Sequence, residues 1–252
     1  MTNIDKSKDV LEIAVEWDAI CEKRELLIDN DKDFSLKYVT APCILRNLAE
    51  DSPNRVIDVG CGTGFITNQI SQNCDYCCGI DISAKSIELA KNKYRSKNLK
   101  FVNTTISDFN PNNKFDACVA NMVFMTDPEW VSSIQQIYKV LNDNAYLLIM
   151  ITHPCSWPHY WGYIDAPWFN YNKEIYIEHD FRTSLSETIG VTTHIHRPLS
   201  MYINGLIGGG FNIIKIEDPY PIEKIPDSYN YNYPRFLFIK CKKDISQQIK
   251  ID

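Results

Sequence analysis

Residues 58–64 read Asp-Val-Gly-Cys-Gly-Thr-Gly, so that an acid and three glycines stand at alternate positions. An apolar, β-branched run over residues 56–59 precedes these glycines, and a helix-like pattern begins at Phe65. A strand, a glycine turn and a helix together form a crevice in which the backbone can approach a ligand closely. The free N–H groups and the partial positive charge of the helix N-terminus favour a nucleotide-like ligand. The chemistry that this stretch predicts is therefore cofactor binding.

The spacing of the glycines restricts the ligand. A dinucleotide fingerprint, G-x-G-x-x-G, that started at Gly60 would need a glycine at position 65, where Phe65 stands. A phosphate-binding P-loop would need a Lys-Ser/Thr pair after its last glycine, and none follows. The acid-x-Gly-x-Gly-x-Gly pattern instead closely resembles the class I S-adenosylmethionine-dependent methyltransferases over residues 55–67. Weaker landmarks extend this resemblance to about Lys243.

The resemblance implies S-adenosylmethionine as the cofactor and indicates which residues hold it. Asp81 ends the next predicted strand, about 20 residues beyond the first glycine, where an acid accepts hydrogen bonds from both ribose hydroxyls. Many relatives carry an acid and a small apolar residue at the adenine, and Thr105 and Ile106 occupy those positions here. Either these two residues hold the adenine, or the more peripheral Asp108 does. The full predicted cofactor set is Asp58, Gly60, Cys61, Gly62, Gly64, Asp81, Ile82, Thr105, Ile106, Asn121 and Met122.

Predicted strands and helices alternate from residue 55 to residue 151, which predicts an α/β fold. The resemblance implies a Rossmann-like, doubly wound, seven-stranded and mostly parallel sheet whose last strand is antiparallel, with an aromatic lid inserted after the fifth strand. We expect a single methyltransferase domain over residues 1–252. Its parts are an N-terminal helical cap (1–50), a cofactor-binding core (51–151), a substrate lid (152–197), a final helix and strands (198–243) and a tail (244–252).

The expected lid is rich in Trp, Tyr, His and Pro and shows no long regular period. Aromatic walls would exclude water and accept a flat or cationic acceptor, whereas the alternative is a satellite hydrophobic cluster beneath a long loop. Trp17 and Tyr38, which precede the core, either fold over the substrate or pack their helix on the core. The predicted acceptor-binding residues are Trp17, Tyr38, Tyr160, Trp168 and His194.

His153 follows the fifth predicted strand by two residues and is the candidate catalytic residue. An imidazole with a pKa near neutrality could orient or deprotonate an acceptor oxygen or nitrogen there. The alternative is that His153 turns the chain and bonds to a backbone carbonyl. His194 and His196 alternate as on a strand, so these histidines are not spaced as a metal site and no metal is expected.

Bulk composition limits the remaining functions. The 252 residues are 44% hydrophobic and 23% charged, as in an ordinary soluble protein, and the net charge of −6 argues against a phosphate backbone as the main partner. We expect a cytoplasmic protein, because the N-terminus has no apolar signal core and no run of about 18 apolar residues exists. The nine scattered cysteines fit reduced thiols, and Cys74-x-x-Cys77 lacks a second pair to complete a metal site.

Together these observations predict an enzyme that transfers a methyl group from S-adenosylmethionine to an oxygen or nitrogen, with carbon also open, of a small-molecule acceptor. One alternative keeps the fold and takes tRNA or protein as the acceptor. Another is a non-catalytic module that binds S-adenosylmethionine. The expected partner is the small-molecule acceptor, with no nucleic acid and no membrane, and the chain is expected to be a monomer or a homodimer.

Overall fold

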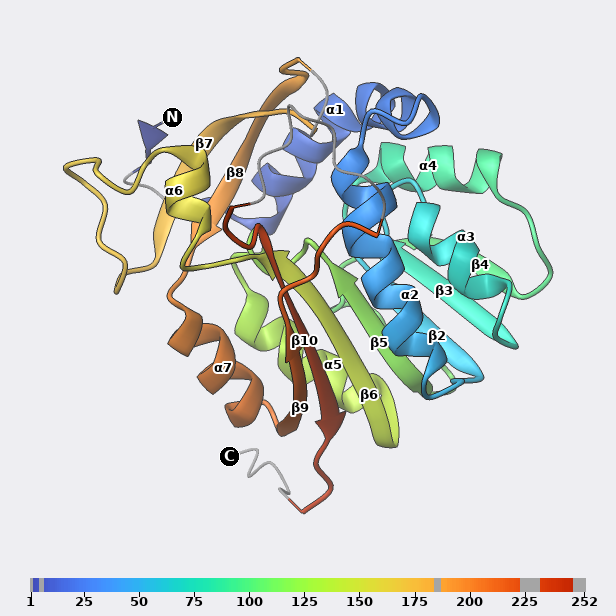
Figure 1. Ribbon diagram of the computed structural model, residues 1–252. Helices are drawn as coiled ribbons and strands as arrows, with labels where there is room; N and C mark the ends of the chain where they lie inside the picture. The colour runs from blue at the N-terminus through green and yellow to red at the C-terminus, as the bar shows by residue number, and fades with distance from the viewer. Residues whose placement is uncertain (1, 5–6, 184–186, 223–231, 247–252) are drawn as a thin grey trace.

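The computed structural model describes residues 2–4, 7–183, 187–222 and 232–246, and a seven-stranded sheet runs through its centre (Figure 1). The strand order is β4-β3-β2-β5-β6-β10-β9, in which the first five are parallel and β10 is antiparallel to both of its neighbours. This topology confirms the expected Rossmann-like sheet with an antiparallel last strand. The strands are β2 (Arg55–Val59), β3 (Tyr76–Asp81), β4 (Leu99–Asn103), β5 (Phe115–Asn121), β6 (Leu141–Thr152), β9 (Phe211–Glu217) and β10 (Phe236–Lys243).

Helices cover both faces of this sheet, as Figure 1 shows. One layer contains α2 (Ala41–Ala49), α3 (Phe65–Ser71) and α4 (Ala84–Lys93). The other layer contains α5 (Trp130–Val140) and α7 (Leu199–Gly208). Because both faces are covered, the inner strands read as nearly continuous apolar runs rather than as alternating ones.

Several element ends differ from the expected ones. The apolar residues at 99–106 predict a strand to 106, but β4 ends at Asn103, because residues 106–108 form a turn. The sequence Asp127-Pro-Glu-Trp130 predicts a helix with its N-cap at Asp127 and a proline at its first position, but α5 begins at Trp130. The Asp127 carboxylate accepts hydrogen bonds from the Glu129 N–H (2.7 Å) and from the Ser133 hydroxyl in the first turn of α5 (2.6 Å). These shifts leave the order of strands and helices in the core unchanged.

The region expected as an irregular lid contains a second sheet. β7 (Ile175–Phe181) and β8 (Gly190–His196) pair antiparallel, and the short β1 (Thr2–Asn3) adds to β7. We call this three-stranded layer the cap sheet; α6 (Trp157–Trp161) precedes it. Apart from the alternation of His194 and His196, the sequence pattern did not predict these strands. β1 pairs with β7 across most of the chain, and β7 and β8 mix histidines, threonines and aromatic residues.

The helix α1 (Val10–Asp29) bridges the cap sheet and α4. It begins with a capping box between Asp9 and Glu12. Toward the cap sheet, the Glu16 carboxylate accepts hydrogen bonds from the N–H (2.7 Å) and hydroxyl (2.8 Å) of Thr193. Toward α4, the Asp18 carboxylate accepts from the Ser83 hydroxyl (2.6 Å). A five-residue π-helix, η1 (Leu36–Thr40), leads from α1 into α2.

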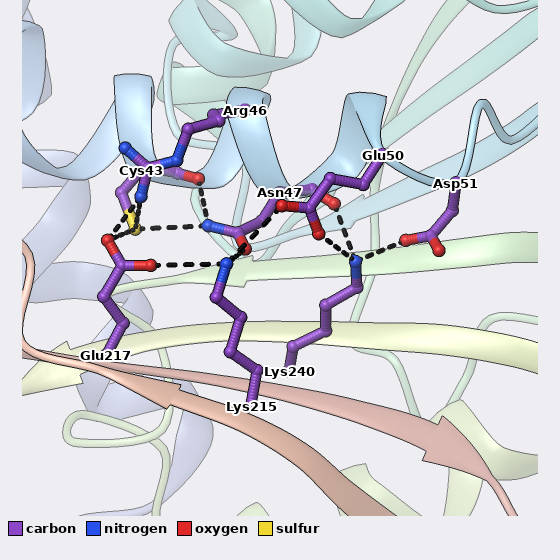
Figure 2. Close-up of polar contacts among 8 residues, drawn as sticks. All are labelled: Cys43, Arg46, Asn47, Glu50, Asp51, Lys215, Glu217 and Lys240. Carbon is purple, nitrogen blue, oxygen red and sulfur yellow. Dashed lines mark hydrogen bonds and ion pairs between the residues drawn. The ribbon is translucent and has the colours of Figure 1, made fainter.

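A polar network attaches α2 to the last two strands of the sheet (Figure 2). Lys240 of β10 has a side chain that is only 4% exposed, and its ammonium donates to the backbone carbonyl of Asn47 (2.9 Å). Carboxylates of Glu50 (3.0 Å) and Asp51 (2.6 Å) neutralise that ammonium, while Lys215 of β9 donates to the Asn47 side chain (2.6 Å). The network therefore fixes the C-terminal end of α2 just before β2 begins.

In the part of the chain that the structure describes, no helix combines the length and the apolar character needed to cross a membrane. All nine cysteines lie in this part and are free thiols. Residues 219–233 are rich in proline and tyrosine, which predicts a loop. This predicted loop and the predicted tail fall partly outside the described residues, at 223–231 and 247–252.

Candidate functional site

A cavity lies at the carboxyl ends of β2, β3 and β5, next to the turn that follows β4, and α1 forms one of its walls. We call it the sheet-end cavity. In sheets of this topology, ligands bind outside the carboxyl ends of the strands. Among its lining residues are ten of the eleven predicted cofactor residues: Asp58, Gly60, Cys61, Gly62, Asp81, Ile82, Thr105, Ile106, Asn121 and Met122.

The glycine turn brings the backbone to the cavity without side chains in the way. Gly60 has a φ of +68°, and a Cβ there would lie 2.4 Å from Cγ2 of Val123. Gly64, the one predicted cofactor residue outside the lining, begins α3 with a φ of +88°. A Cβ on Gly64 would lie 2.7 Å from the Phe101 ring. Both positions therefore require glycine, the first beside the ligand space and the second at the start of the helix.

Asp81 links the glycine turn to the start of α4. One carboxylate oxygen accepts the Gly62 N–H (2.7 Å), and the other accepts the Ser83 N–H (2.8 Å). Burial raises the pKa of Asp81, and these two hydrogen bonds oppose that rise. Each carboxylate oxygen has a further lone pair, so Asp81 can still accept hydrogen bonds from a ligand in the cavity.

Asp58 is the most deeply buried acid of the cavity lining, at 1% exposure. Burial raises its pKa to about 7; a hydrogen bond from the Thr67 hydroxyl (2.6 Å) opposes the rise, and the neighbouring charge of Asp81 adds to it. A cationic ligand nearby would favour the charged form of this carboxyl. Asp58 and Asp81 thus give the cavity an acidic floor.

Two buried polar atoms in the lining have no hydrogen-bond partner among the described residues: Nε of Arg24 and Oδ1 of Asn121. The Arg24 guanidinium reaches over the glycine turn from α1, with Nη1 3.5 Å from where a Cβ on Gly62 would lie. Its nearest carboxylate is that of Asp33, at 3.8 Å from Nη2. Because unpartnered buried polar groups are costly, this donor and this acceptor fit a ligand with an anionic group and an N–H donor.

Arg24 was missed by the sequence reasoning. The available signal was its position on α1, seven residues after Trp17 and three after Cys21, which places all three on one helix face. Asp127 and Glu129, which also line the cavity, were missed because residues 127–130 were interpreted as the start of a helix. Which way a helix face or a loop points is set by tertiary packing, so the sequence alone does not specify it.

The adenine end predicted at Thr105 and Ile106 has its own internal bonding. The Thr105 hydroxyl donates to Asp108 (2.8 Å) and accepts the Asp108 N–H (3.0 Å). Asp108 is therefore engaged in closing the turn after β4, and it does not line the cavity. Thr105 and Ile106 do line it, and their part in holding the adenine stays a prediction.

The predicted acceptor-binding residues are not brought together. Trp17 lines the sheet-end cavity, whereas Tyr38 lines a separate groove that shares Phe65 with it. Tyr160, Trp168 and His194 line neither hollow in the described part of the chain.

Trp168 and His194 pack inside the insertion, whereas Tyr160 contacts Arg235, which directly precedes β10. The Tyr160 ring lies 4.0 Å from the Arg235 guanidinium, and Trp168 stacks on Tyr163 with ring centroids 5.8 Å apart. His194 lies 5.5 Å from the Trp161 ring, and burial lowers its pKa to about 3. This packing agrees with the satellite-cluster alternative for much of the insertion.

His153 lies at the start of the insertion and outside the cavity lining. Its Nδ1 accepts the Cys155 N–H (3.2 Å), and its Nε2 lies 3.5 Å from Asp218. Its own N–H donates to the Arg235 carbonyl (2.9 Å). Burial lowers the pKa of His153, and the Asp218 charge opposes this. Its catalytic role stays a prediction, and the contacts match the turn-forming alternative.

Among the described residues, no group of three or more His, Cys, Asp or Glu side chains could hold a metal ion. The site instead offers glycine backbone, two acids, one guanidinium and one amide oxygen. This donor set matches an amino-acid nucleoside: carboxylates for ribose hydroxyls, a cation for a carboxylate, and an amide oxygen for an amine.

Known proteins resemble this chain in sequence and in fold. Residues 50–170 match a family model described as a methyltransferase domain. A putative S-adenosylmethionine-dependent methyltransferase from Listeria monocytogenes has a similar structure, with a TM-score of 0.65 and 20% identity over 81% of this chain and 98% of that one. The chain therefore carries a methyltransferase domain at residues 50–170 and shares the fold of S-adenosylmethionine-dependent methyltransferases, whose cofactor fits the residues of the sheet-end cavity.

Curated relatives match only part of their own length. The malonyl-[acyl-carrier protein] O-methyltransferase of Bacillus anthracis is 26% identical over 38% of this chain and 35% of its own. The trans-aconitate 2-methyltransferase of Rhodopseudomonas palustris is 23% identical over 63% of this chain and 59% of its own. The chain thus spans between one third and three fifths of these two relatives.

Proposed function

We propose that this chain transfers the methyl group of S-adenosylmethionine to an oxygen or nitrogen of a small-molecule acceptor. The observation that carries the proposal is the sheet-end cavity, where Asp81 and the unpartnered atoms of Arg24 and Asn121 surround one space. The two curated relatives, named for malonyl-[acyl-carrier protein] and trans-aconitate, support an acceptor that is a small acid or an acyl group. The net charge of −6 further favours such an acceptor over a nucleic acid.

The cofactor, when bound, supplies a methyl group on a positively charged sulfur that is displaced in line by the acceptor atom. The chain's own residues then act mainly by position. Asp81 binds the ribose hydroxyls, Arg24 the carboxylate and Asn121 the amine, while Thr105 and Ile106 border the adenine. Trp17 and the other α1 residues of the lining exclude water from the cavity.

The acceptor would enter from the insertion side, where Met122 at the end of β5 faces the cavity. His153 would serve as a base only if the acceptor reaches Nε2, the ring nitrogen that faces Asp218. A cytoplasmic location, with a monomeric or homodimeric chain, completes the proposal.

The test is methyl transfer from radiolabelled S-adenosylmethionine to a panel of small carboxylic acids, phenols and amines, with bulk tRNA and a mixed protein substrate in parallel. The proposal predicts label in at least one small molecule and none in the macromolecules above the level of the Asp81→Ala variant. Transfer confined to tRNA or protein would contradict the small-molecule acceptor.

A further inference from the structure

Arg197, at the end of β8, is a fully buried cation far from the glycine turn in sequence. Its guanidinium donates to the carbonyls of Phe124 (2.5 Å) and Asp127 (2.9 Å) and to the Glu174 carboxylate (2.5 Å). It also lies 5.4 Å from the Trp130 ring. Of these contact residues, only Asp127 lines the sheet-end cavity.

The two carbonyls belong to the loop between β5 and α5, residues 122–129. This loop forms one wall of the sheet-end cavity through Met122, Val123, Thr126, Asp127, Pro128 and Glu129. It has no regular secondary structure beyond turns, so its shape depends on what its backbone bonds to.

The cap sheet supplies these bonds. Besides the two from Arg197, the Ile195 N–H of β8 donates to the Met125 carbonyl (2.7 Å). Three carbonyls of the loop, at 124, 125 and 127, are thus held by β8 and the residue that follows it.

The loop also contains backbone strain. Met122 has a φ of +60°, in the left-handed region that costs a residue with a side chain about 1–3 kcal/mol. Such a conformation persists only where the surroundings fix it, and the bonds from β8 begin two residues further on. The strained residue is itself part of the cavity wall.

From this geometry we propose that Arg197 is a positioning residue for the cofactor: it sets the shape of loop 122–129 and so couples the cap sheet to the sheet-end cavity. This inference rests on the proposed function. It assigns the cap sheet a part in cofactor binding, although no residue of its strands β1, β7 and β8 lines the cavity.

Arginine is required for this role because its planar guanidinium presents five donors in a fixed fork. The fork reaches two carbonyls and one carboxylate at the same time. A lysine would keep the charge, but its compact ammonium cannot span all three acceptors. The loop would then lose at least one of its carbonyl contacts.

The test measures binding of S-adenosylhomocysteine by calorimetry to the wild-type chain, Arg197→Lys and Lys240→Gln, at a temperature where each is folded by circular dichroism. Lys240 of β10 is the matched control. It is also a buried cation that donates to a backbone carbonyl and to carboxylates, but its partners lie at the C-terminal end of α2, away from loop 122–129 (Figure 2). We expect Arg197→Lys to weaken binding at least about 10-fold. Lys240→Gln should lower the melting temperature but keep the dissociation constant within about 2-fold.

A second arm needs no substitution and decides the question if Arg197→Lys does not fold. Hydrogen exchange of the wild-type chain is compared with and without S-adenosylhomocysteine. The coupling predicts slower exchange at the Ile195 amide of β8 on binding, and no change at β7 amides such as that of Ile177, which faces β8 but not the loop.

Four results would overturn the inference. Wild-type affinity in a folded Arg197→Lys variant, or equal weakening in Lys240→Gln, would show that Arg197 acts only on stability. If the ligand leaves the exchange rate of the Ile195 amide unchanged while it slows exchange at amides of the cavity lining, no coupling exists. A wild-type chain that does not bind S-adenosylhomocysteine at all would overturn the proposed function, and the coupling with it.

Discussion

The sheet-end cavity and the cap sheet bury opposite kinds of titratable groups. In the cavity, burial raises the pKa of Asp58 to about 7 and also raises the pKa of Asp81. In the cap sheet, burial lowers the pKa of His194 to about 3 and also lowers the pKa of His196. The acids of one region and the bases of the other are thus both held toward their neutral forms by the same cause, the loss of water.

What differs is the partners that the two regions provide. The cavity leaves Nε of Arg24 and Oδ1 of Asn121 without partners among the described residues, so a ligand can satisfy them. In the cap sheet, His196 has the Tyr171 carbonyl as a partner (3.1 Å), and His194 lies among tryptophan rings. We infer that the first region is prepared for a charged ligand and that the second is a packed layer that supports it.

The largest expected effect is on the free energy of unfolding, and it comes from His194 in the cap sheet. The unfolded His194 binds a proton near pH 6.5, whereas the folded one does so near pH 3, so this residue makes the free energy of unfolding fall as the pH drops from about 6.5 to 3. The loss is up to about 5 kcal/mol. Urea unfolding across this range should show a flatter profile in His194→Gln than in the wild-type chain, and parallel profiles would contradict the account.

Asp58 should make the free energy of unfolding change with pH in the direction opposite to that of His194. Its folded pKa lies above the unfolded value, so its contribution to stability is full below about pH 3.8 and is lost as the pH rises through about 7. The loss is up to about 4 kcal/mol. Asn at this position can still accept the Thr67 hydroxyl. In the same urea unfolding experiment without ligand, the free energy of unfolding of Asp58→Asn should therefore rise relative to that of the wild-type chain from pH 4 to pH 8. If the difference between the two chains does not change with pH, the pKa of Asp58 is not raised by burial.

Removing Asp81 tests the ribose contact in the cavity. Two charge-assisted hydrogen bonds of about 1.5 kcal/mol each correspond to an affinity loss of roughly 100-fold for S-adenosylhomocysteine in Asp81→Ala. Calorimetry measures the loss, and Asp143→Ala is the control, because that carboxylate is 75% exposed at the other end of the sheet. Equal affinities for both variants would remove Asp81 from the site.

The smallest expected effect sharpens the assignment of Arg24. Arg24→Gln should bind S-adenosylhomocysteine about 10-fold more weakly, because one charged hydrogen-bond partner of the carboxylate is lost. Binding of 5′-methylthioadenosine, which has no carboxylate, should stay within about 2-fold of wild type. A parallel loss for both ligands would place Arg24 elsewhere than at the carboxylate.

The two regions also differ in how far the sequence predicts them. The cavity floor is local: Asp58 and the glycines fall within seven residues, and the next strand end brings Asp81 beside them by a regular parallel pairing. The sheet order and the antiparallel β10 followed from the family resemblance. Apolar residues at helical spacing predict helices at 65–72 and 198–209, and the structure has them at 65–71 and 199–208, because an amphipathic helix shows its period in the local sequence.

The cap sheet and the cavity wall were not predictable in this way. β1 pairs with β7 across most of the chain, as Thr2 with Glu178, and such a contact leaves no short-range pattern. Arginine usually lies at the protein surface, so the sequence does not indicate that the side chains of Arg24 and Arg197 turn inward. Their burial depends on where α1 and β8 lie in the fold. The same reason explains why Tyr160, Trp168 and His194, chosen for their chemistry, lie outside the cavity lining in the structure.

One titration tests the central claim, that the sheet-end cavity is the S-adenosylmethionine site. S-adenosylhomocysteine is titrated by calorimetry into the wild-type chain at pH 7.5 and into Gly60→Val, in which the added side chain would enter the space of Val123 beside the turn. The account predicts saturable binding of one ligand per chain in the wild type and no measurable heat in a folded Gly60→Val variant. Absence of binding to the wild-type chain, or undiminished binding to the variant, would contradict it.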